Sequence, residues 1–576
     1  LAVADGAVRV TGCEVLTLTA RGGAHVEATI QNNSFSTSSP TGNAIDVTTT
    51  ANADTVQVAI DDNVDITSSS GDAIHLDGSA GGTLNVTSLC GNSVHGATAG
   101  AGIFADTVVF DAAPLPSGDA DFVGDTVACT AATLIGSSGN RIGGSGLVLL
   151  NVTGDLDLGP FSSFVGTAGG LDEVALQIAG NGVFNAGAGN GFQFVQDSGT
   201  LDSIDGPAVL IDTARLEYLP PSSVTTVVSM NSDTVGIGLT DVSSSFAVSG
   251  TTTIDSTGTD GVVVTDSSAQ VTFLGEFVIS NTGGRGVSLT NMSADFVVQD
   301  MAPAGLPGTA NSLITGTTGD AFSSVGHTDD IRYYGDIVNT SGNSVDIRDH
   351  GGPAGQILFA GLITDSGEGI YLDNNDQGAM PATASFTGGL DLDTGANTAF
   401  TAINGGNVEV LSGSVSTTAD TTTGTLVNIV NTTITANGVF FDSTSKTGGA
   451  NGIILTNVGS GNFISDAGSI SNQTNRGVDV SSGSGDVVVD ASISTTSTGR
   501  SVEVTTHTGG TVDFNGSIDD NGLGIRLANN VGAVLRFDGG MDVDTAAGSG
   551  TEEGFEATGG GTLHGTGTND VNTSLA

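Results

Sequence analysis

A short pattern of apolar and polar positions recurs along the chain: glycine, apolar, any residue, apolar, a small or polar residue, then asparagine or aspartate. It occupies residues 236–241, 261–266, 286–291, 369–374, 452–457 and 524–529, with a variant at 477–482. In Gly477-Val478-Asp479-Val480, the two-residue alternation places both valines on one side of a strand and Asp479 on the other. The glycine and the closing Asn or Asp favour tight turns. We therefore expect a series of four-residue strands, each with one buried face.

The spacing of these strands indicates how they pack. Their leading glycines are 25, 25, 83, 83, 25 and 47 residues apart, so that the steps are multiples of roughly 25 residues. One short strand buries little surface, whereas equivalent strands stacked in successive coils share one core and pair their backbones. We predict an all-β fold, a right-handed parallel β-helix (β-solenoid) of about 22–24 coils. A series of β-sandwich domains is the alternative, but those would repeat at about 100 residues.

A longer internal repeat supports the solenoid. Residues 359–375 and 514–530 are identical at ten of 17 positions, and residues 386–394 match residues 537–545 in the same order. On these repeats the chain resembles the secreted bacterial β-strand-repeat proteins of the right-handed parallel β-helix (pectin-lyase-like) class. The resemblance covers residues 230–576 clearly and residues 1–230 weakly. It implies an architecture, and it says little about function because this architecture serves many.

The regularity of the pattern suggests two parts. Residues 1–235 read as irregular rungs with protruding loops, and they include prolines such as Pro114 and Pro116. Residues 236–576 read as regular rungs that continue the first part. Loops that bind a partner would be expected within residues 110–235, because loops tolerate insertions and carry binding residues.

Charge narrows the range of partners. The chain has 62 Asp and Glu against 12 Lys and Arg, a net charge of −50. Such a surface repels nucleic acid and anionic membranes, because binding either requires basic side chains. No apolar run is long enough to span a membrane as a helix, so we expect no membrane insertion. Disorder is not expected, because mean hydropathy is +0.16 and the apolar residues are patterned.

The chain contains three cysteines, Cys13, Cys90 and Cys129, and no CxxC pair. The favoured interpretation is that they are small buried apolar residues. The alternative is one disulfide between Cys90 and Cys129, with Cys13 left over. An odd number of cysteines excludes a complete disulfide framework.

Few residues in the sequence have the pattern of a catalytic site. Enzymes of the pectin-lyase-like class combine carboxylates with basic residues that hold an anionic sugar, and here the twelve basic residues are scattered. The seven histidines are isolated, without the spacing of metal ligands. His327 with Asp329 and Asp330 is the best single cluster, and a solvated loop is the favoured interpretation for it. We therefore expect no enzymatic activity, with a polysaccharide lyase or hydrolase as the least favoured alternative.

Calcium is the cofactor that the sequence supports best, because hard oxygen ligands are abundant. The candidate ligands are Asp373, Asn374, Asn375 and Asp376 in one turn, and Asp519 and Asp520 in another. A further acidic turn runs over residues 61–65. The competing interpretation is that these residues form turns by bonding the backbone. Asn374 and Asn529 occupy equivalent positions of the long repeat, which favours that interpretation.

The expected function is that of an extracellular or cell-surface structural protein. No capping helix is recognisable at either terminus, and a solenoid without caps exposes core and strand edges. We therefore expect end-to-end self-association into a filament, sheath or surface fibre. The alternatives are a segment of a longer exoprotein and an adhesin that binds cells or cell-surface glycans.

Overall fold

The protein is a parallel β-solenoid of about 18 turns with about 26 residues per turn, and its described part contains no helix. The computed structural model describes residues 5–10, 15–35, 42–68, 71–97, 100–111, 126–129, 134–135, 144–158, 164–166, 173–181, 191–196, 198–218, 223–299, 311–352, 355–413, 415–496, 498–545 and 554–573. The all-β parallel solenoid is thus confirmed. The predicted count of 22–24 coils is too high, because some coils are longer than 25 residues: Ile103 lies beside Leu147, 44 residues later.

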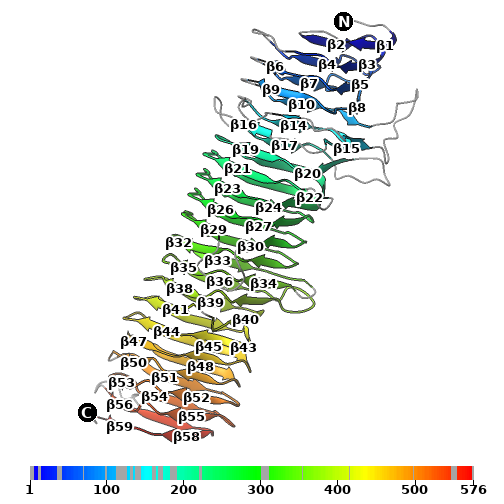
Figure 1. Ribbon diagram of the computed structural model, residues 1–576. Helices are drawn as coiled ribbons and strands as arrows, with labels where there is room; N and C mark the ends of the chain where they lie inside the picture. Colours follow the sequence, from blue (N-terminus) through cyan, green and yellow to red (C-terminus); the bar gives the residue numbers. More distant parts are fainter. Residues whose placement is uncertain are drawn as a thin grey trace. The chain divides into compact units, whose positions relative to one another are not determined.

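The chain forms two compact units, Leu1–Gly284 with Ser288–Val297 and Arg285–Val287 with Val298–Ala576. Within each unit a coil contributes up to three strands, one to each of three faces, and successive coils lie side by side (Figure 1). We call these the first, second and third faces in the order in which the chain visits them. The pairing on every face is parallel, because each coil passes in the same direction as the one before it.

The strands up to residue 298 divide among the three faces as follows. On the first face lie β2 (Leu16–Ala20), β4 (Ile45–Thr49), β7 (Ile74–Asp77), β10 (Ile103–Asp106), β14 (Leu147–Leu150), β17 (Leu176–Ala179), β20 (Val209–Tyr218), β22 (Ile237–Val248), β24 (Val262–Thr265) and β27 (Val287–Thr290). On the second lie β1 (Asp5–Val10), β3 (His25–Gln31), β5 (Thr55–Asp61), β8 (Thr83–Ser88), β11 (Val109–Phe110), β12 (Thr126–Ala128), β15 (Thr153–Asp157), β18 (Phe192–Gln196), β25 (Gln270–Phe273) and β28 (Phe296–Val298). On the third lie β6 (Ile66–Ser68), β9 (Ser93–Ala97), β13 (Leu134–Ile135), β16 (Phe164–Gly166), β19 (Thr200–Ser203), β21 (Thr226–Met230), β23 (Thr252–Asp255) and β26 (Phe277–Ser280). The long strands β20 and β22 run on from the first face to the second.

The strands after residue 298 follow the same order. On the first face lie β30 (Phe322–Val325), β33 (Asn343–Arg348), β36 (Gly369–Asp373), β39 (Phe400–Ile403), β42 (Val427–Val430), β45 (Asn451–Gly459), β48 (Arg476–Gly483), β51 (Arg500–Thr505), β54 (Ile525–Ala528) and β57 (Phe555–Thr558). On the second lie β31 (Ile331–Tyr333), β34 (Gln356–Phe359), β37 (Thr383–Phe386), β40 (Asn407–Val410), β43 (Thr433–Phe441), β46 (Phe463–Ser465), β49 (Val487–Val489), β52 (Thr511–Phe514), β55 (Val534–Phe537) and β58 (Thr562–Gly565). On the third lie β29 (Leu313–Thr315), β32 (Asp336–Asn339), β35 (Ile363–Asp365), β38 (Leu390–Asp393), β41 (Thr418–Thr421), β44 (Ser443–Lys446), β47 (Gly468–Gln473), β50 (Ser492–Thr495), β53 (Ile518–Asp520), β56 (Met541–Thr545) and β59 (Asn569–Thr573).

The two-residue alternation read from the sequence builds the core. In β38, Leu390 and Leu392 are buried while Asp391 and Asp393 are exposed. Both copies of the long repeat place phenylalanines in the core in the same way. Phe359 stacks on Phe386 at 5.6 Å between ring centroids, and Phe514 stacks on Phe537 at 5.3 Å. The repeat in sequence is therefore a repeat in packing.

The corners between the first and second faces explain the Asn or Asp that closes each short motif. Asn374, Asn457 and Asn529 have φ values of 60°, 54° and 58°. Asn tolerates this left-handed backbone better than most residues, since its short side chain bonds locally. The amide of Asn457 also donates to Oδ1 of Asn431 at 3.1 Å, one coil earlier. The corner residues thus turn the chain and connect consecutive coils.

Candidate functional site

The candidate calcium residues at 373–376 lie at one of these corners, directly after β36. Asn374 donates from Nδ2 to Oδ1 of Asp349 at 2.6 Å, in the preceding coil. Asp373 accepts from Nδ2 of Asn404 at 2.9 Å, in the following coil. Both side chains are thus bonded to side chains of neighbouring coils, and the φ of 60° at Asn374 is that of a turn residue.

Asn375 points inward and is buried. Its Oδ1 accepts the backbone N–H of His350 at 3.1 Å, and its Nδ2 donates to the carbonyl of Ile347 at 3.2 Å. The side chain of Asp376 lies against Gly405, where a Cβ would meet the carboxylate at about 2.5 Å. The structure therefore brings Asp373 and Asn374 to the outside of the corner and places Asn375 within the core.

Asp519 and Asp520 lie on opposite sides of β53. Asp519 is exposed on the third face, whereas Asp520 is fully buried. The Asp520 carboxylate accepts backbone N–H groups from Ser501 at 2.7 Å, Gly522 at 2.7 Å and Gly524 at 3.0 Å. The two carboxylates do not converge on a common point.

Asp365 occupies the position of Asp520 in the first copy of the long repeat, and sequence reasoning did not single it out. It is buried and accepts backbone N–H groups from Ser344 at 3.0 Å, Gly367 at 2.8 Å and Gly369 at 3.1 Å. Burial raises the pKa of this carboxyl, against the lowering effect of these bonds. The two-residue alternation that begins at Ile363 and Ile518 could have predicted this burial, because it places Asp365 and Asp520 on the inward side of their strands.

The acidic turn at residues 61–65 also links coils. Oδ1 of Asp61 accepts from the Ser88 hydroxyl at 2.6 Å and from the N–H of Cys90 at 3.0 Å. Asn63 is buried and donates to Oδ1 of Asn92 at 3.0 Å, and it accepts from Asn33 at the same distance. Three consecutive coils are thereby joined by one chain of amide bonds.

The interpretation of His327 as part of a solvated loop is wrong. His327 is fully buried, and so is His350 one coil later. His327 follows Gly326, whose φ of 70° turns the chain, and the position after the turn faces the core. Asp330 is partly exposed to solvent and forms an ion pair with Arg332. The cluster read from sequence is therefore divided between core and surface.

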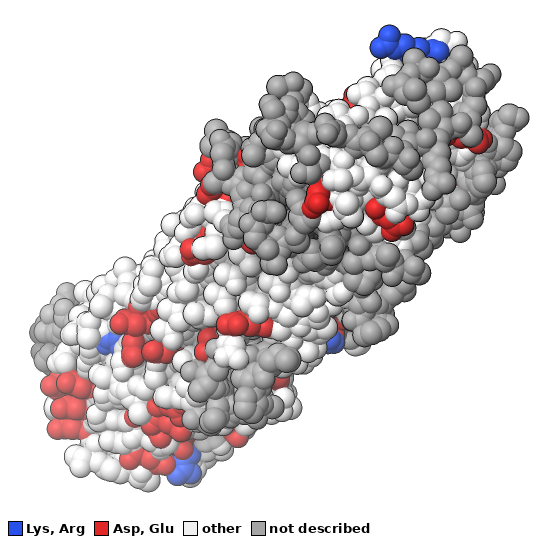
Figure 2. All heavy atoms as spheres, turned by 45° about the horizontal axis from the view of Figure 1, so that its top comes forward, with Lys and Arg blue, Asp and Glu red and all other residues white. Residues whose placement is uncertain are grey.

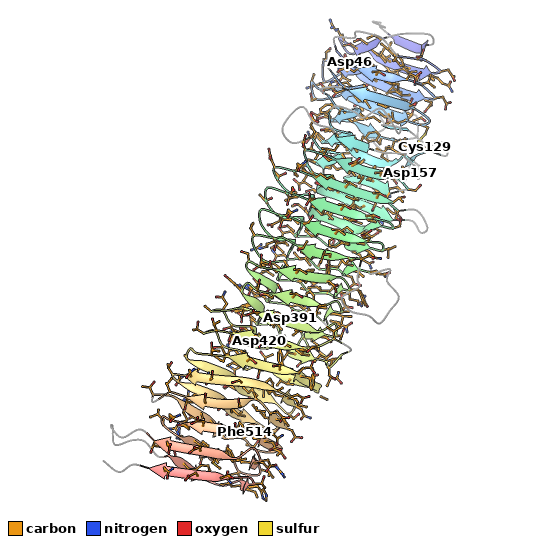
Figure 3. All side chains as sticks on the ribbon, turned by 60° about the vertical axis from the view of Figure 1, so that its left-hand side comes forward. Asp46, Cys129, Asp157, Asp391, Asp420 and Phe514 are labelled. Atoms are coloured by element: carbon orange, nitrogen blue, oxygen red, sulfur yellow. A yellow bond between two sulfur atoms is a disulfide. The ribbon has the colours of Figure 1, made fainter. Side chains whose placement is uncertain are left out.

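Carboxylates form short columns on the outside of the third face. Asp393 lies in register with Asp420, and Asp391 with Thr418 (Figure 3). Burial and the charges of Asp393 and Asp391 raise the pKa of Asp420. A second column aligns Asp519 of β53 with a carboxylate in each of β56 and β59. Across the described ranges, no group of three or more His, Cys, Asp or Glu is arranged to hold a metal ion.

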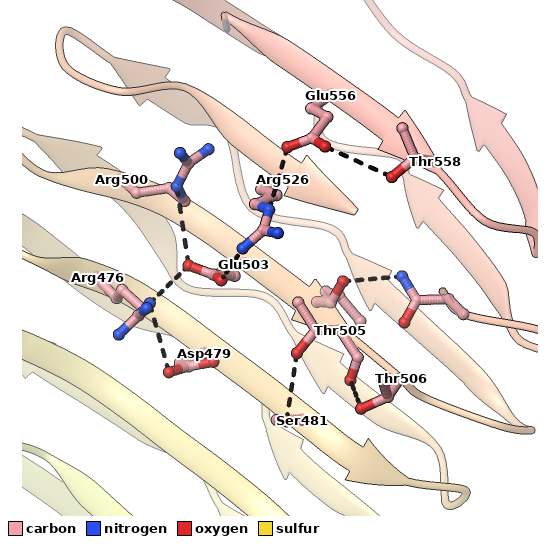
Figure 4. Close-up of polar contacts among 12 residues, drawn as sticks. Arg476, Asp479, Ser481, Arg500, Glu503, Thr505, Thr506, Arg526, Glu556 and Thr558 are labelled. Atoms are coloured by element: carbon pink, nitrogen blue, oxygen red, sulfur yellow. Dashed lines mark hydrogen bonds and ion pairs between the residues drawn. The ribbon is translucent and has the colours of Figure 1, made fainter. Parts of the chain in front are cut away.

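Arginines and glutamates form a compensating column on the first face near the C-terminal end. Glu503 accepts from Nε of Arg476 at 2.7 Å and from Nη1 of Arg526 at 3.1 Å, and Nε of Arg500 lies 3.8 Å away (Figure 4). Arg526 also pairs with Glu556 at 3.1 Å. Burial alone would raise the pKa of Glu503, but the bond from Arg476 and the three positive charges lower it. On the face shown in Figure 2, acidic side chains outnumber basic ones.

Cys90 and Cys129 form a disulfide, with 5.4 Å between their Cα atoms. Cys90 follows β8 and Cys129 follows β12, so the bond links two segments of the second face. The interpretation of all cysteines as free apolar residues is therefore wrong for these two, and the disulfide alternative is confirmed. Cys13 lies outside the described residues.

The last described coil differs from those before it in exposure. Leu563 of β58 is 45% exposed, although Leu535, its partner in β55, is 3% exposed. Val571 of β59 is 43% exposed, whereas Val543 in β56 is fully buried. Inward positions that other coils cover are open here, and one edge of β57, β58 and β59 has no neighbouring strand among the described residues.

No family model, no curated protein and no solved structure matches this chain. The described part also contains no helix with the length and apolar character needed to cross a membrane.

Proposed function

We propose that this chain is an extracellular structural protein whose copies join end to end into a filament, sheath or surface fibre. The stacking of equivalent coils through parallel strands carries the proposal, as where β55 pairs with β58 and β56 with β59. Leu563 and Val571 expose apolar surface that corresponding residues bury one coil earlier. Exposed strand edges are sites at which another chain adds strands. A contact that joins one end of a copy to the other end of the next propagates into a filament.

The first described strands have the same parallel pairing as the later ones. Among the described residues, β1 pairs with β3 and β2 with β4, each on one side. A second copy would therefore present parallel strands in the same order of faces as those that end in β57, β58 and β59. The stacking of coils within the chain supplies the geometry for stacking between chains.

Two further properties favour an extracellular setting within the secreted β-strand-repeat class. The Cys90–Cys129 disulfide is typical of oxidising compartments. The net charge of −50 keeps the sides of neighbouring solenoids apart through repulsion, which favours contacts at the ends. Salt screens this repulsion, so we expect more lateral association at high ionic strength.

The test is sedimentation velocity and electron microscopy of the purified chain. We expect concentration-dependent filaments. The double variant Leu563→Lys/Val571→Lys should remain monomeric, because charged residues at a strand edge oppose strand addition. Met380→Lys is the matched control, since Met380 is 52% exposed but lies away from the last coil. It should assemble like the unaltered chain.

Circular dichroism should show the same β content for all three proteins. Monomers of the unaltered chain at every concentration would overturn the proposal. So would native extracellular material in which the edge of β58 is covered by further coils of the same polypeptide, which mass spectrometry of that material would reveal.

A further inference from the structure

Two histidines stack on one another inside the second unit, at the corner between its first and second faces. His327 follows β30 and His350 follows β33. Their ring centroids are 5.2 Å apart, and the planes are inclined by 22°. Both side chains are fully buried.

Among the described residues, no group meets the hydrogen-bond geometry for the ring nitrogens of this pair, although the backbone carbonyls of Asp329 and Asp330 lie near them. Neither Nδ1 nor Nε2 of His327 forms a hydrogen bond, and the same holds for His350. Gly355 lies directly against His350, because a Cβ there would be 2.4 Å from Nε2. Other coils place uncharged residues at this inward position (Asn375, Thr432, Val458 and Asn530), and one further coil places the buried His507 there. The fold therefore accommodates the two imidazoles as neutral rings.

The charged groups near the pair are few. Asp329 and Asp330 face it from the segment before β31, and Arg332 neutralises part of that charge through Asp330. From the following coil comes Asn375, which is uncharged and binds the backbone of His350. No carboxylate in the described part bonds to either ring.

Protonation is therefore unfavourable in the folded state. Burial and the neighbouring His350 together lower the pKa of His327 to about 3, although the nearby backbone carbonyls of Asp329 and Asp330 oppose this. Burial lowers the pKa of His350 to about 4, although Asp330 and Asp329 oppose this. The ordinary value, 6.5, applies once the corner opens and the rings meet water.

We propose that the His327–His350 pair is an acid-sensitive latch that opens this corner of the second unit in mildly acidic solution. When the corner opens, the imidazole rings meet water and one ring nitrogen binds the first proton. Closing would then bury an uncompensated charge against the neighbouring imidazole, so the corner stays open. The bonds that part are Gly351 N–H to the His327 carbonyl at 2.8 Å and His350 N–H to Asn375 Oδ1 at 3.1 Å.

The direction follows from proton linkage. The open form binds more protons than the closed form below the ordinary histidine value, so the closed form loses stability as pH falls. Each histidine raises the opening equilibrium about tenfold per pH unit between about pH 6.5 and its closed-state value. Two histidines together give up to about a hundredfold per unit.

The test is hydrogen exchange with mass spectrometry on the intact chain, from about pH 7.5 to about pH 5, with rates corrected for intrinsic exchange. Peptides covering residues 326–360 should lose protection as pH falls. Peptides around His507 serve as an internal comparison, because its Nε2 lies 3.0 Å from the carbonyl of Gly485 and so has a partner. They should lose less protection.

Two variants separate the latch from general acid sensitivity. His327→Asn/His350→Asn and His327→Val/His350→Thr use side chains found at this position in other coils, and both should make exchange at 326–360 independent of pH. His507→Asn should leave the acid response of residues 326–360 unchanged. The proposal is overturned if the unaltered chain keeps its protection at about pH 5, or if both double variants fold and retain the same acid response.

Discussion

Asp365 and Asp520 are buried carboxylates, and each holds a turn closed by accepting three backbone N–H groups. Such bonds to a charged acceptor are stronger than those between neutral groups. Because the donors are buried, the carboxylate is also what satisfies them. At this scale the acidic residues are part of the fold as well as of the surface.

Asp520→Asn should destabilise the protein by about 1–3 kcal/mol, because one carboxylate oxygen becomes an N–H donor that faces backbone donors. Asp519→Asn, one residue earlier but exposed, should change stability by less than about 0.5 kcal/mol. Urea denaturation followed by circular dichroism measures both. Equal effects of the two substitutions would contradict the role given to Asp520.

Several residue positions were predictable, and others were not. The closing Asn of each motif was expected to form a turn, and the positive φ of Asn374 and Asn529 confirms it. His327 was misjudged because its polar neighbours Asp329 and Asp330 suggested a surface loop. The side chain of His327 points inward because the turn ends at Gly326. The position of that turn cannot be recognised from the sequence of a single coil.

Strands of different coils are joined by polar columns as well as by backbone pairing. Glu503 in β51 bonds Arg476 of β48 and Arg526 of β54, so three consecutive strands share one carboxylate. The charged residues of this column are present in the sequence at outward positions of their strands. The register places Asp479 beside Glu503, and Glu503 beside Arg526. Which of these residues lie side by side depends on the number of residues in each coil. Because that number varies, the ion pairs could not be predicted from the sequence.

Glu503→Gln should destabilise the protein by about 1–3 kcal/mol at neutral pH, because the negative charge near three arginines is removed and one acceptor oxygen becomes an N–H donor. The pKa of Glu503 is lowered in the folded state, so its stabilisation is present above about 4.5 and is lost as pH falls below that value. The difference between the two proteins should therefore shrink in acid. Denaturant titrations at several pH values measure it, with Glu556→Gln as the more exposed control.

The Cys90–Cys129 disulfide acts on a segment where coil length is irregular. It closes a loop with a sequence separation of 39 residues. Cys90→Ala/Cys129→Ala should lower stability by about 4 kcal/mol on the chain-entropy account, within the range seen for such bonds. Thermal unfolding and limited proteolysis near residues 90–130 measure the change, and resistance equal to the unaltered chain would contradict it.

Across the whole molecule, the fold class followed from the period of the pattern, while the number of coils did not. The roughly 25-residue steps of the later glycines do not apply between Ile103 and Leu147, where one circuit takes 44 residues. Insertions of this kind lack the short motif. The number of residues in a coil that contains one could therefore not be predicted from the sequence. Self-association was expected from the sequence, and it stays a proposal.

Removing one complete coil should preserve the fold. Deletion of residues 453–477 brings Val478 to the place of Ile453, beside Val427 in β42. Each coil contacts its neighbours alone, so the remaining interfaces are retained. Deletion of residues 453–465 instead puts a third-face strand on the first face and should leave an aggregating protein. Circular dichroism and gel filtration distinguish the outcomes, and equal behaviour of the two deletions would contradict the prediction.

The parallel register has a consequence for how this sequence changes over time. A buried side chain such as Val478 has its closest partners at Ile453 and Val502, about one coil earlier and later, rather than beside it in the chain. A substitution that enlarges one residue is therefore relieved by a smaller residue about 25 positions away. Correlated substitutions in related sequences should appear as bands parallel to the diagonal, displaced by one coil length, and a shift in that displacement would mark every insertion.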